Sequence, residues 1–322
     1  MTTLLCIAGA GLASATITPG FQRSSVVRLM TSSLRGNAPA VPAAAPVPSR
    51  SPVVSPPVIS PPVISPAPAA ATVAGPSPAD QAAAAGKVTQ AARAILPGAD
   101  VGFEVFDRDT GTMLASQDAD RQFASMSVVK LLIALDVLAG DNGALPDNGT
   151  QQELHQMLAA SDDDIADDLW SADGGPAIVT RMASTLELTG TQPPSDPGEW
   201  GDTLITAQDM VKVYQYITNQ LPQPQRDLIL GALSDAPKIA ADGFNQYFGI
   251  PDGLPGASWA VKQGWGTSGS EAVMNSTGLV GPDWRYVVVV LVSAPVNSYS
   301  TVPAAVTAGA AAVSSLVSPG TS

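Results

Sequence analysis

The chain is poor in residues on which several kinds of protein depend. It has one cysteine, Cys6, and one histidine, His155, among 322 residues. A single cysteine excludes an internal disulfide framework and a cysteine-ligated metal site. A Ser-His-Asp triad is disfavoured, because His155 would have to serve it alone and no nucleophile-elbow pattern accompanies it. We therefore interpret His155 as a polar helix residue.

Charge is also scarce, and positive charge most of all. Charged residues make up 13% of the chain, and 15 Lys and Arg stand against 28 Asp and Glu, for a formal net charge of −13. Nucleic-acid binding depends on lysines and arginines that neutralise phosphates, and no basic patch is visible. The composition therefore argues against a nucleic-acid partner. The length suits one large domain or two small ones.

Residues 1–36 form an apolar, signal-like N-terminus. The run 4–17 is too short to span a bilayer, and Ala13-Ser14-Ala15 resembles a signal-peptidase site. Because the positive region of a secretory signal is missing, we expect a signal peptide whose true start lies upstream of Met1. An unstructured apolar tail is the alternative. Cys6 lies too near Met1 for a lipoprotein signal to precede it.

Residues 37–78 are rich in Pro, Ala, Val and Ser. They contain the near-repeat of Val-Ile-Ser-Pro-Pro at 58–62 and Val-Ile-Ser-Pro at 63–66. Proline blocks helix formation, so this stretch is expected to be an extended linker. A spacer between an export signal and a domain fits a protein of the cell envelope or the extracellular space. A ligand for an SH3-type domain is the competing interpretation, which export disfavours.

The folded domain is expected over 79–318. A helix is predicted at 79–96 and closed by Pro97-Gly98, and a hairpin at 101–116 turns at Asp109-Thr110-Gly111. Further helices are predicted to about 139 and at 150–160, 163–170, 176–188, 206–219, 225–236 and 301–317, and further strands at 258–264, 272–280 and 284–293. We predict an α+β fold in which five strands from both ends of the chain form one antiparallel sheet. Terminal helices would cover one face, and the middle helices would form a second lobe.

The stretch 124–135 begins polar and continues as a helix that is apolar on almost every face, which is typical of a helix in the middle of a domain. Ser127 and Lys130 open it, and residues three apart on a helix are neighbours. A buried amine can lose its charge and act as a base, and a helix N-terminus offers free N–H groups to an oxyanion. The pair therefore suggests a nucleophilic serine.

Two other short motifs are weaker by themselves. Ser161-Asp162-Asp163 lies between two predicted helices, and Lys262-Gln263-Gly264 ends a predicted strand. The first is explained as well by an N-cap followed by acids in a first turn. The second is explained as well by an edge-strand lysine that blocks aggregation. Taken alone, each motif favours the structural explanation.

Taken together and in this order, the three motifs resemble those of the penicillin-recognising serine hydrolases, which are the class A β-lactamases and the D,D-peptidases. Their motifs are Ser-x-x-Lys, Ser-Asp-Asn and Lys-Thr-Gly. The hairpin at 101–111 resembles the opening hairpin of class A enzymes, and 200–210 resembles the end of their Ω-loop and the helix after it. The resemblance covers about 80–317 and implies a divergent member with a β-lactamase/transpeptidase-like fold.

By that resemblance, Ser127 would accept the acyl group, Lys130 would be its general base, and Ser161 would relay the proton to the leaving nitrogen. Lys262 would attract a substrate carboxylate and tune Ser161, and the N–H groups of Ser127 and Trp265 would form the oxyanion hole. The residues implied in substrate binding are Asp163, Lys262, Gln263, Gly264 and Trp265. No metal or organic cofactor is implied. The implied partner is a β-lactam or a peptidoglycan stem peptide, bound by a monomer without a stable transmembrane span.

Several departures from the family pattern remove groups that the family uses to bind its substrate or to release the acyl group. Gln263 replaces the threonine whose hydroxyl binds the substrate carboxylate, and Asp163 replaces an asparagine that donates to a substrate amide. The segment 190–200 is short and lacks the Glu-x-x-Leu-Asn whose glutamate activates the deacylating water. No arginine lies within 264–278, and the spacing of 161 − 127 = 34 residues implies a trimmed helical lobe.

Three functions therefore remain open. The first is an active-serine hydrolase or D,D-peptidase-like enzyme whose acyl-enzyme is long-lived. The second is a degenerate β-lactamase fold that binds peptidoglycan or a protein partner. The third is a secreted structural protein, which gives no reason for a lysine at the start of a buried helix. The enzyme requires the Lys130 amine within hydrogen-bond reach of Ser127, with Ser161 nearby in an open cleft.

Overall fold

A computed structural model of the chain describes residues 76–140 and 143–317. The signal-like segment 1–36, Cys6 and nearly all of the linker 37–78 lie outside the described residues. The division of the chain at 79 therefore remains a prediction. No helix of the described part combines the length and the hydropathy that a membrane span needs.

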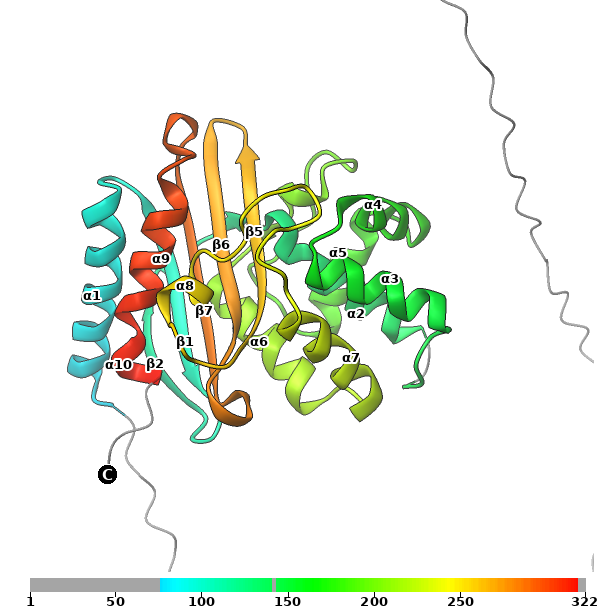
Figure 1. Cartoon of the computed structure of the whole chain (residues 1–322), viewed down its shortest axis with the longest axis horizontal. Helices are drawn as coiled ribbons and strands as arrows, with labels where there is room; N and C mark the ends of the chain where they lie inside the picture. Colours follow the sequence, from blue (N-terminus) through cyan, green and yellow to red (C-terminus); the bar gives the residue numbers. More distant parts are fainter. Residues whose placement is uncertain (1–75, 141–142, 318–322) are drawn as a thin grey trace, which may run out of the picture. The chain divides into compact units, whose positions relative to one another are not determined.

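Five antiparallel strands form the central sheet (Figure 1). They are β1 Asp100–Asp107, β2 Thr112–Gln117, β5 Trp259–Ser268, β6 Glu271–Val280 and β7 Tyr286–Pro295, in the order β2-β1-β7-β6-β5. This confirms the α+β fold and the predicted sheet. A second, two-stranded sheet of β3 (Phe123–Ala124) and β4 (Leu204–Ile205) was not predicted, because two residues are too few for an alternating pattern to be visible.

The central strand β7 is buried on both faces, as its run of valines predicted. Val287, Val289 and Leu291 face the core shared with the helical lobe. Val288, Val290 and Val292 face the core under the terminal helices. Successive side chains of a strand point to opposite faces, so one uninterrupted apolar run serves both cores.

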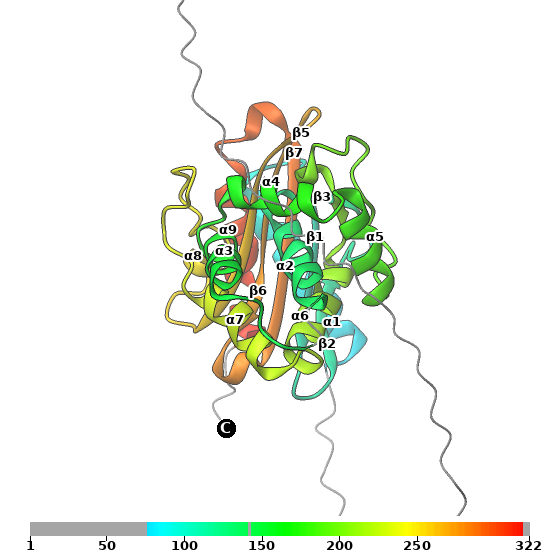
Figure 2. The same ribbon diagram turned by 90° about the vertical axis from the view of Figure 1, so that its right-hand side faces the viewer.

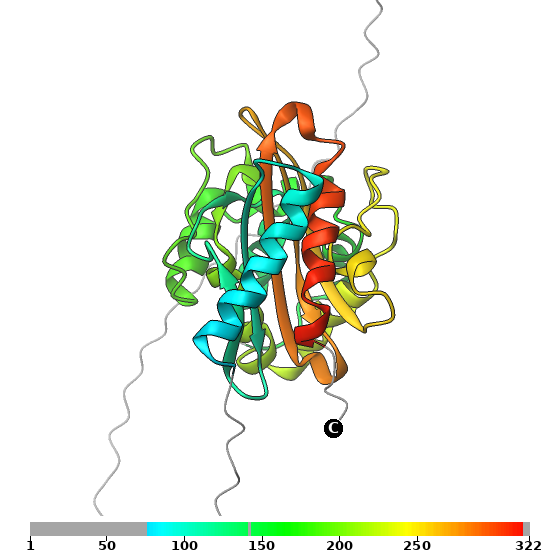
Figure 3. The ribbon, with the colours of Figure 1, turned by 90° about the vertical axis from the view of Figure 1, so that its left-hand side faces the viewer.

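Helices from both ends of the chain cover one face of the sheet. Figure 3 shows α1 (Pro78–Ile95) beside α9 (Val302–Ala312), and the short α10 (Ser314–Val317) follows. Ser77 caps α1 in a capping box with Asp80. The helices approach closely because their contact is made of small residues: a Cβ at Gly309 would lie 3.7 Å from that of Ala92. The short α8 (Ile250–Gly253) packs against α9.

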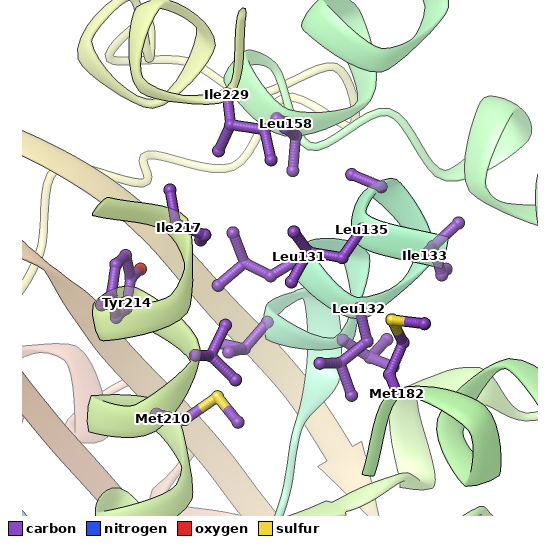
Figure 4. Close-up of a cluster of buried hydrophobic side chains, with 14 of the residues drawn as sticks. Leu131, Leu132, Ile133, Leu135, Leu158, Met182, Met210, Tyr214, Ile217 and Ile229 are labelled. Atoms are coloured by element: carbon purple, nitrogen blue, oxygen red, sulfur yellow. The ribbon is translucent and has the colours of Figure 1, made fainter. Parts of the chain in front are cut away.

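The other face carries the reduced helical lobe (Figure 2). Its helices are α2 Lys130–Ala139, α3 Asn148–Ala159, α4 Asp163–Ala172, α5 Pro176–Thr185, α6 Ala207–Asn219 and α7 Gln223–Ser234. Short 3-10 helices occur before α2 (η1 Met126–Val129), before β4 (η2 Trp200–Asp202), between β6 and β7 (η3 Pro282–Trp284) and after β7 (η4 Val296–Ser298). Figure 4 shows Leu131, Leu132 and Leu135 of α2 among apolar side chains of the surrounding helices. The helix that the sequence marked as central is thus the core of this lobe.

Candidate active site

The turn that carries Ser127 is held by contacts from strands β5 and β6 of the central sheet. β3 leads into η1, and the Nδ2 of Asn275 on β6 donates to the carbonyl oxygens of Ala124 at 2.9 Å and Ser125 at 3.1 Å. A Cβ at Gly264 would lie 2.6 Å from the Ser125 carbonyl oxygen and 3.2 Å from the Ser127 nitrogen. Only glycine therefore lets β5 lie directly against this turn. Met126, just before Ser127, has a left-handed φ of 48°.

Lys130 points its amine at two serines. Its Nζ lies 3.1 Å from the Ser127 Oγ, 2.8 Å from the Ser161 carbonyl oxygen and 3.4 Å from the Ser161 Oγ. Ser161 has a left-handed φ of 57°, in the short link between α3 and α4. Non-glycine residues at positive φ cluster at functional sites, and here two of them flank the same lysine.

Lys262 reaches the same cluster from β5. Its Nζ donates to the Ser161 Oγ at 2.8 Å and to the Gln263 carbonyl oxygen at 3.2 Å. Ser127, Lys130, Ser161 and Lys262, here called the floor group, are 5%, 0%, 2% and 1% exposed. The structure therefore brings these four predicted residues into one hydrogen-bonded cluster, and Lys262 is not the solvated edge-strand lysine of the structural explanation.

Burial shifts the protonation of both lysines. Burial lowers the pKa of Lys130, while the Asp163 carboxylate opposes that shift. Burial lowers the pKa of Lys262 well below its ordinary value, and the nearby charge of Lys130 adds to this. A buried amine with a lowered pKa is suited to proton transfer at neutral pH.

Asp163 forms an ion pair with the Lys130 amine at the N-terminus of α4. Its neighbour Asp162 is the N-cap of that helix and accepts from the Ile165 N–H at 3.3 Å. The N-cap explanation of the Ser161-Asp162-Asp163 motif is therefore correct for Asp162. It also fits Asp163, an acid in the first turn of α4, but it does not account for Ser161 or for the ion pair of Asp163 with Lys130.

Gln263 turns away from this cluster. Its Nε2 donates to the backbone carbonyl oxygens of Gln246, at 3.2 Å, and Phe248, at 2.5 Å, in the segment before α8. The side chain is buried and does not line the cavity described next. The structure thus gives Gln263 a contact that anchors a loop, and it does not bring this residue to a position where a substrate would touch it. Gly264 contributes through the close approach of backbones described above.

A cavity of about 750 Å³ opens above Ser127. Its described lining includes Met126, Ser127, Asp163, Asp167, Glu199, Trp200, Asp202, Asp242, Phe244, Trp265 and Tyr299, together with several glycines and Thr267. Trp265 was predicted at this site. The outer residues Asp167, Glu199, Trp200, Asp202, Asp242 and Trp265 are here called the rim. The volume suits a small organic ligand.

Two aspartates orient the tryptophans of the rim. The Nε1 of Trp200 donates to Asp167 at 2.7 Å, and the Nε1 of Trp265 donates to Asp242 at 2.9 Å. Phe244 stacks on Trp265 with ring centroids 5.0 Å apart and an interplanar angle of 12°. The Lys130 amine lies 4.8 Å from the centroid of the Trp200 ring. Most of these residues were not predicted, because nothing in their local pattern separates a cavity aspartate from a solvated one.

The segment 189–203 contributes residues 198–202 to the lining of the cavity. Its base is fixed by buried Asp209, which accepts from the backbone N–H of Gly190 at 2.8 Å, and its middle by Trp170, whose Nε1 donates to the Pro197 carbonyl oxygen at 2.9 Å. Of the two glutamates near this segment, Glu199 lines the cavity and Glu187 does not. His155 does not line the described cavity. Its Nε2 lies 3.2 Å from the Asp235 carboxylate, as expected of a polar helix residue.

Comparison with known families now gives this arrangement a context. The model of the beta-lactamase enzyme family matches residues 147–316, which include Ser161 and Lys262. The chain belongs to this family. The match begins after Ser127 and Lys130, so the assignment of these two residues rests on the geometry above.

The chain is also similar to curated relatives and shares its fold with solved structures. The chain is 38% identical over 199 residues to "Putative lipoprotein LppW" of Mycobacterium tuberculosis and of Mycobacterium bovis, a match that covers 60% of this chain and 63% of the relative. A beta lactamase from Burkholderia vietnamiensis shares the fold with a TM-score of 0.61 at 18% identity, covering 72% of this chain and 96% of that one. The structure of PBP-A shares it with a TM-score of 0.56 at 19% identity, covering 72% and 95%.

Proposed function

We propose that this chain is an exported active-serine enzyme of the cell envelope that transfers an acyl group through Ser127. The observation that carries the proposal is the Lys130 Nζ, buried and 3.1 Å from the Ser127 Oγ at the base of an open cavity. Export is supported by the signal-like residues 1–36 and by the lipoprotein name of the mycobacterial relatives. The proposed division is a leader at 1–36, a linker at 37–78 and an enzyme domain at 79–318.

The proposed reaction begins when neutral Lys130 accepts the proton of the Ser127 hydroxyl. The Oγ then attacks the carbonyl carbon of an amide, such as a β-lactam or a peptidoglycan-like peptide. A bond forms between Oγ and carbon, and the carbon–nitrogen bond breaks. Ser161, which accepts from Lys262 at 2.8 Å, passes the proton from Lys130 to the leaving nitrogen. The backbone N–H groups of Ser127 and Trp265 would stabilise the oxyanion.

Water must then release the acyl group, and this step is proposed to be slow. The segment 190–200 lacks the Glu-x-x-Leu-Asn pattern, and the one glutamate of the described cavity lining, Glu199, is exposed. A long-lived acyl-enzyme on Ser127 is the expected consequence.

A catalytically inactive binding protein is the second candidate, and the Lys130–Asp163 ion pair favours it. An ammonium donates its protons and has no lone pair, so a permanently charged Lys130 cannot accept the Ser127 proton. In that case the cavity would bind peptidoglycan or a protein partner without acyl transfer.

The test is intact-protein mass spectrometry of the full chain after incubation with two acyl donors. These are a fluorescent penicillin and the uncharged ester p-nitrophenyl hexanoate, each with Ser127→Ala as the control. We expect a stable adduct with the ester, absent from Ser127→Ala. A penicillin adduct would assign the β-lactam class as well. No adduct and no turnover of either donor would contradict the enzyme and favour the binding protein.

A further inference from the structure

The lining of the cavity above Ser127 is negatively charged, which does not suit an anionic substrate. Of its described lining residues, five are acidic and none is basic: Asp163, Asp167, Glu199, Asp202 and Asp242. Within the described part of the chain, Asp163 is the only one of the five in an ion pair. The two lysines of the floor group lie beneath the lining and are almost completely buried.

The side chains that would bind a substrate carboxylate are either absent or bonded elsewhere. The Gln263 amide is engaged by the backbone of Gln246 and Phe248, and no arginine occurs within 264–278. A carboxylate in the cavity would lie among its acidic lining residues, whereas Lys262 is buried and does not line the cavity. Like charges in a cleft repel, and the low-dielectric walls concentrate that field.

The rim also has the second requirement of a cation site, which is fixed aromatic rings. Trp200 and Trp265 both line the cavity, and each is held by an indole N–H donated to a rim aspartate. Phe244 stacks on Trp265 at 5.0 Å, and Tyr299 lies 6.5 Å from Phe244 between ring centroids. The Lys130 amine lies over the Trp200 ring and Phe244 stacks on Trp265, so the carboxylates that hold these rings are the groups left to bind an organic ammonium group.

We infer that the acyl donor of this site carries an ammonium group, which the rim binds through the carboxylates of Asp167 and Asp242 beside the rings of Trp200 and Trp265. This inference rests on the proposed function for the acyl transfer to Ser127, and adds the class of substrate. The ammonium group lies at the rim while the acyl carbon lies over Ser127. A substrate carboxylate at the same place is rejected.

The test uses three p-nitrophenyl esters of equal chain length: 6-aminohexanoyl, which is cationic, hexanoyl, which is uncharged, and the mono-ester of adipic acid, which is anionic. In acylation the ester oxygen–carbon bond breaks, the Ser127 Oγ–carbon bond forms, and p-nitrophenolate is released and measured. With the full chain at low salt we expect acylation to be fastest with the cationic ester, slower with the uncharged ester and slowest with the anionic ester. The rates with the cationic and the anionic ester should differ by about tenfold. The ratio should shrink at high salt, because ions screen exposed charges.

The informative variant is Asp167→Asn/Asp242→Asn. Asparagine still offers a side-chain oxygen to each indole N–H, so the tryptophans stay in place while the charge is lost. We expect the ratio of the acylation rates with the cationic and the anionic ester to fall toward one. The rate with the uncharged ester should stay measurable. The matched control is Asp168→Asn/Asp252→Asn, which removes the same charge from exposed positions outside the cavity lining and should keep the preference.

Two failures can be told apart. If the uncharged ester acylates Ser127 but the three esters react alike, or the control variant loses the preference equally, the ammonium assignment is wrong and the proposed function stands. If no ester acylates, the proposed function fails, and tryptophan fluorescence decides the ligand class. In that arm, 6-aminohexanamide must bind more tightly than hexanamide and adipamic acid, and only in chains that keep Asp167 and Asp242. Equal or absent binding overturns the inference.

Discussion

The floor group and the rim of one cavity differ in burial, in charge and in how they depart from the family pattern. The floor group holds two lysines and two serines, all nearly solvent-free, in the order that the family motifs imply. The rim holds aspartates and tryptophans, and several of its residues are exposed. In the proposed function, chemistry and specificity are carried by these two separate sets of residues, so one set can change while the other stays.

Removing the base of the floor group should have the largest effect. Lys130→Met keeps the length of the side chain but cannot accept the Ser127 proton. We expect acylation by p-nitrophenyl hexanoate to fall on the order of 10²–10⁴-fold. Lys87→Met, at an exposed position of α1, is the matched control and should react like the unchanged chain. A Lys130→Met rate within threefold of the control would remove the base role from the floor group.

Lys262→Met tests whether the buried Lys262 amine of the floor group lowers the stability of the folded chain. Lys262 is buried and contacts no carboxylate within ion-pair distance among the described residues. Replacing such an amine with an apolar side chain should raise the free energy of unfolding at pH 7 by about 1–3 kcal/mol while acylation falls. Urea unfolding of both chains, beside Lys87→Met, measures the difference.

The pH dependence of that difference follows from the lowered pKa of Lys262 in the folded chain. Between that value and about 10.4, the unfolded chain holds a proton that the folded chain does not. The stability contributed by this group is therefore lost as the pH falls and regained as the pH rises through this window. The advantage of Lys262→Met should narrow between pH 7 and pH 9.5, and an advantage that widens would contradict the buried neutral amine.

The smallest effect on the reaction is expected from Asp163, which lines the cavity and contacts Lys130 of the floor group. Asp163 opposes the burial that lowers the pKa of Lys130, so Asp163→Asn should lower that pKa further. In the proposed mechanism the neutral Lys130 amine is the base, so the pH–rate profile for p-nitrophenyl hexanoate should move to lower pH. Asp168→Asn on the same helix is the control. A profile that stays in place, or that moves to higher pH, would contradict the effect of the Asp163 charge on the pKa of Lys130.

The fold was largely predictable because its signals are local. The alternating hairpin after α1, the apolar α2 and the valines of β7 each carry their own pattern, and the predicted sheet is the observed one. The two-residue strands β3 and β4 carry no such pattern. The predicted helix at 301–317 is two helices, with the first ending at Ala312.

The candidate site was predictable only in part. Ser127 and Lys130 form a local pair, and their geometry follows from their spacing at the start of a helix. Ser161 and Lys262 were found through the order of the motifs. Gln263 was expected at the substrate, yet its amide anchors a loop. Successive side chains of a strand point to opposite faces, so Lys262 faces Ser161 while Gln263 faces the segment before α8.

The sequence by itself determined which residues form the sheet, the buried helix and the serine–lysine pair, since each depends on a periodicity of a few residues. Only the tertiary structure decided that Lys262 is buried and that Asp163 pairs with Lys130. It also decided that Asp167 meets Trp200 and Asp242 meets Trp265, pairs that lie 33 and 23 residues apart. The sign of charge around a cavity is a sum over segments that meet only after folding, so no local pattern contains it.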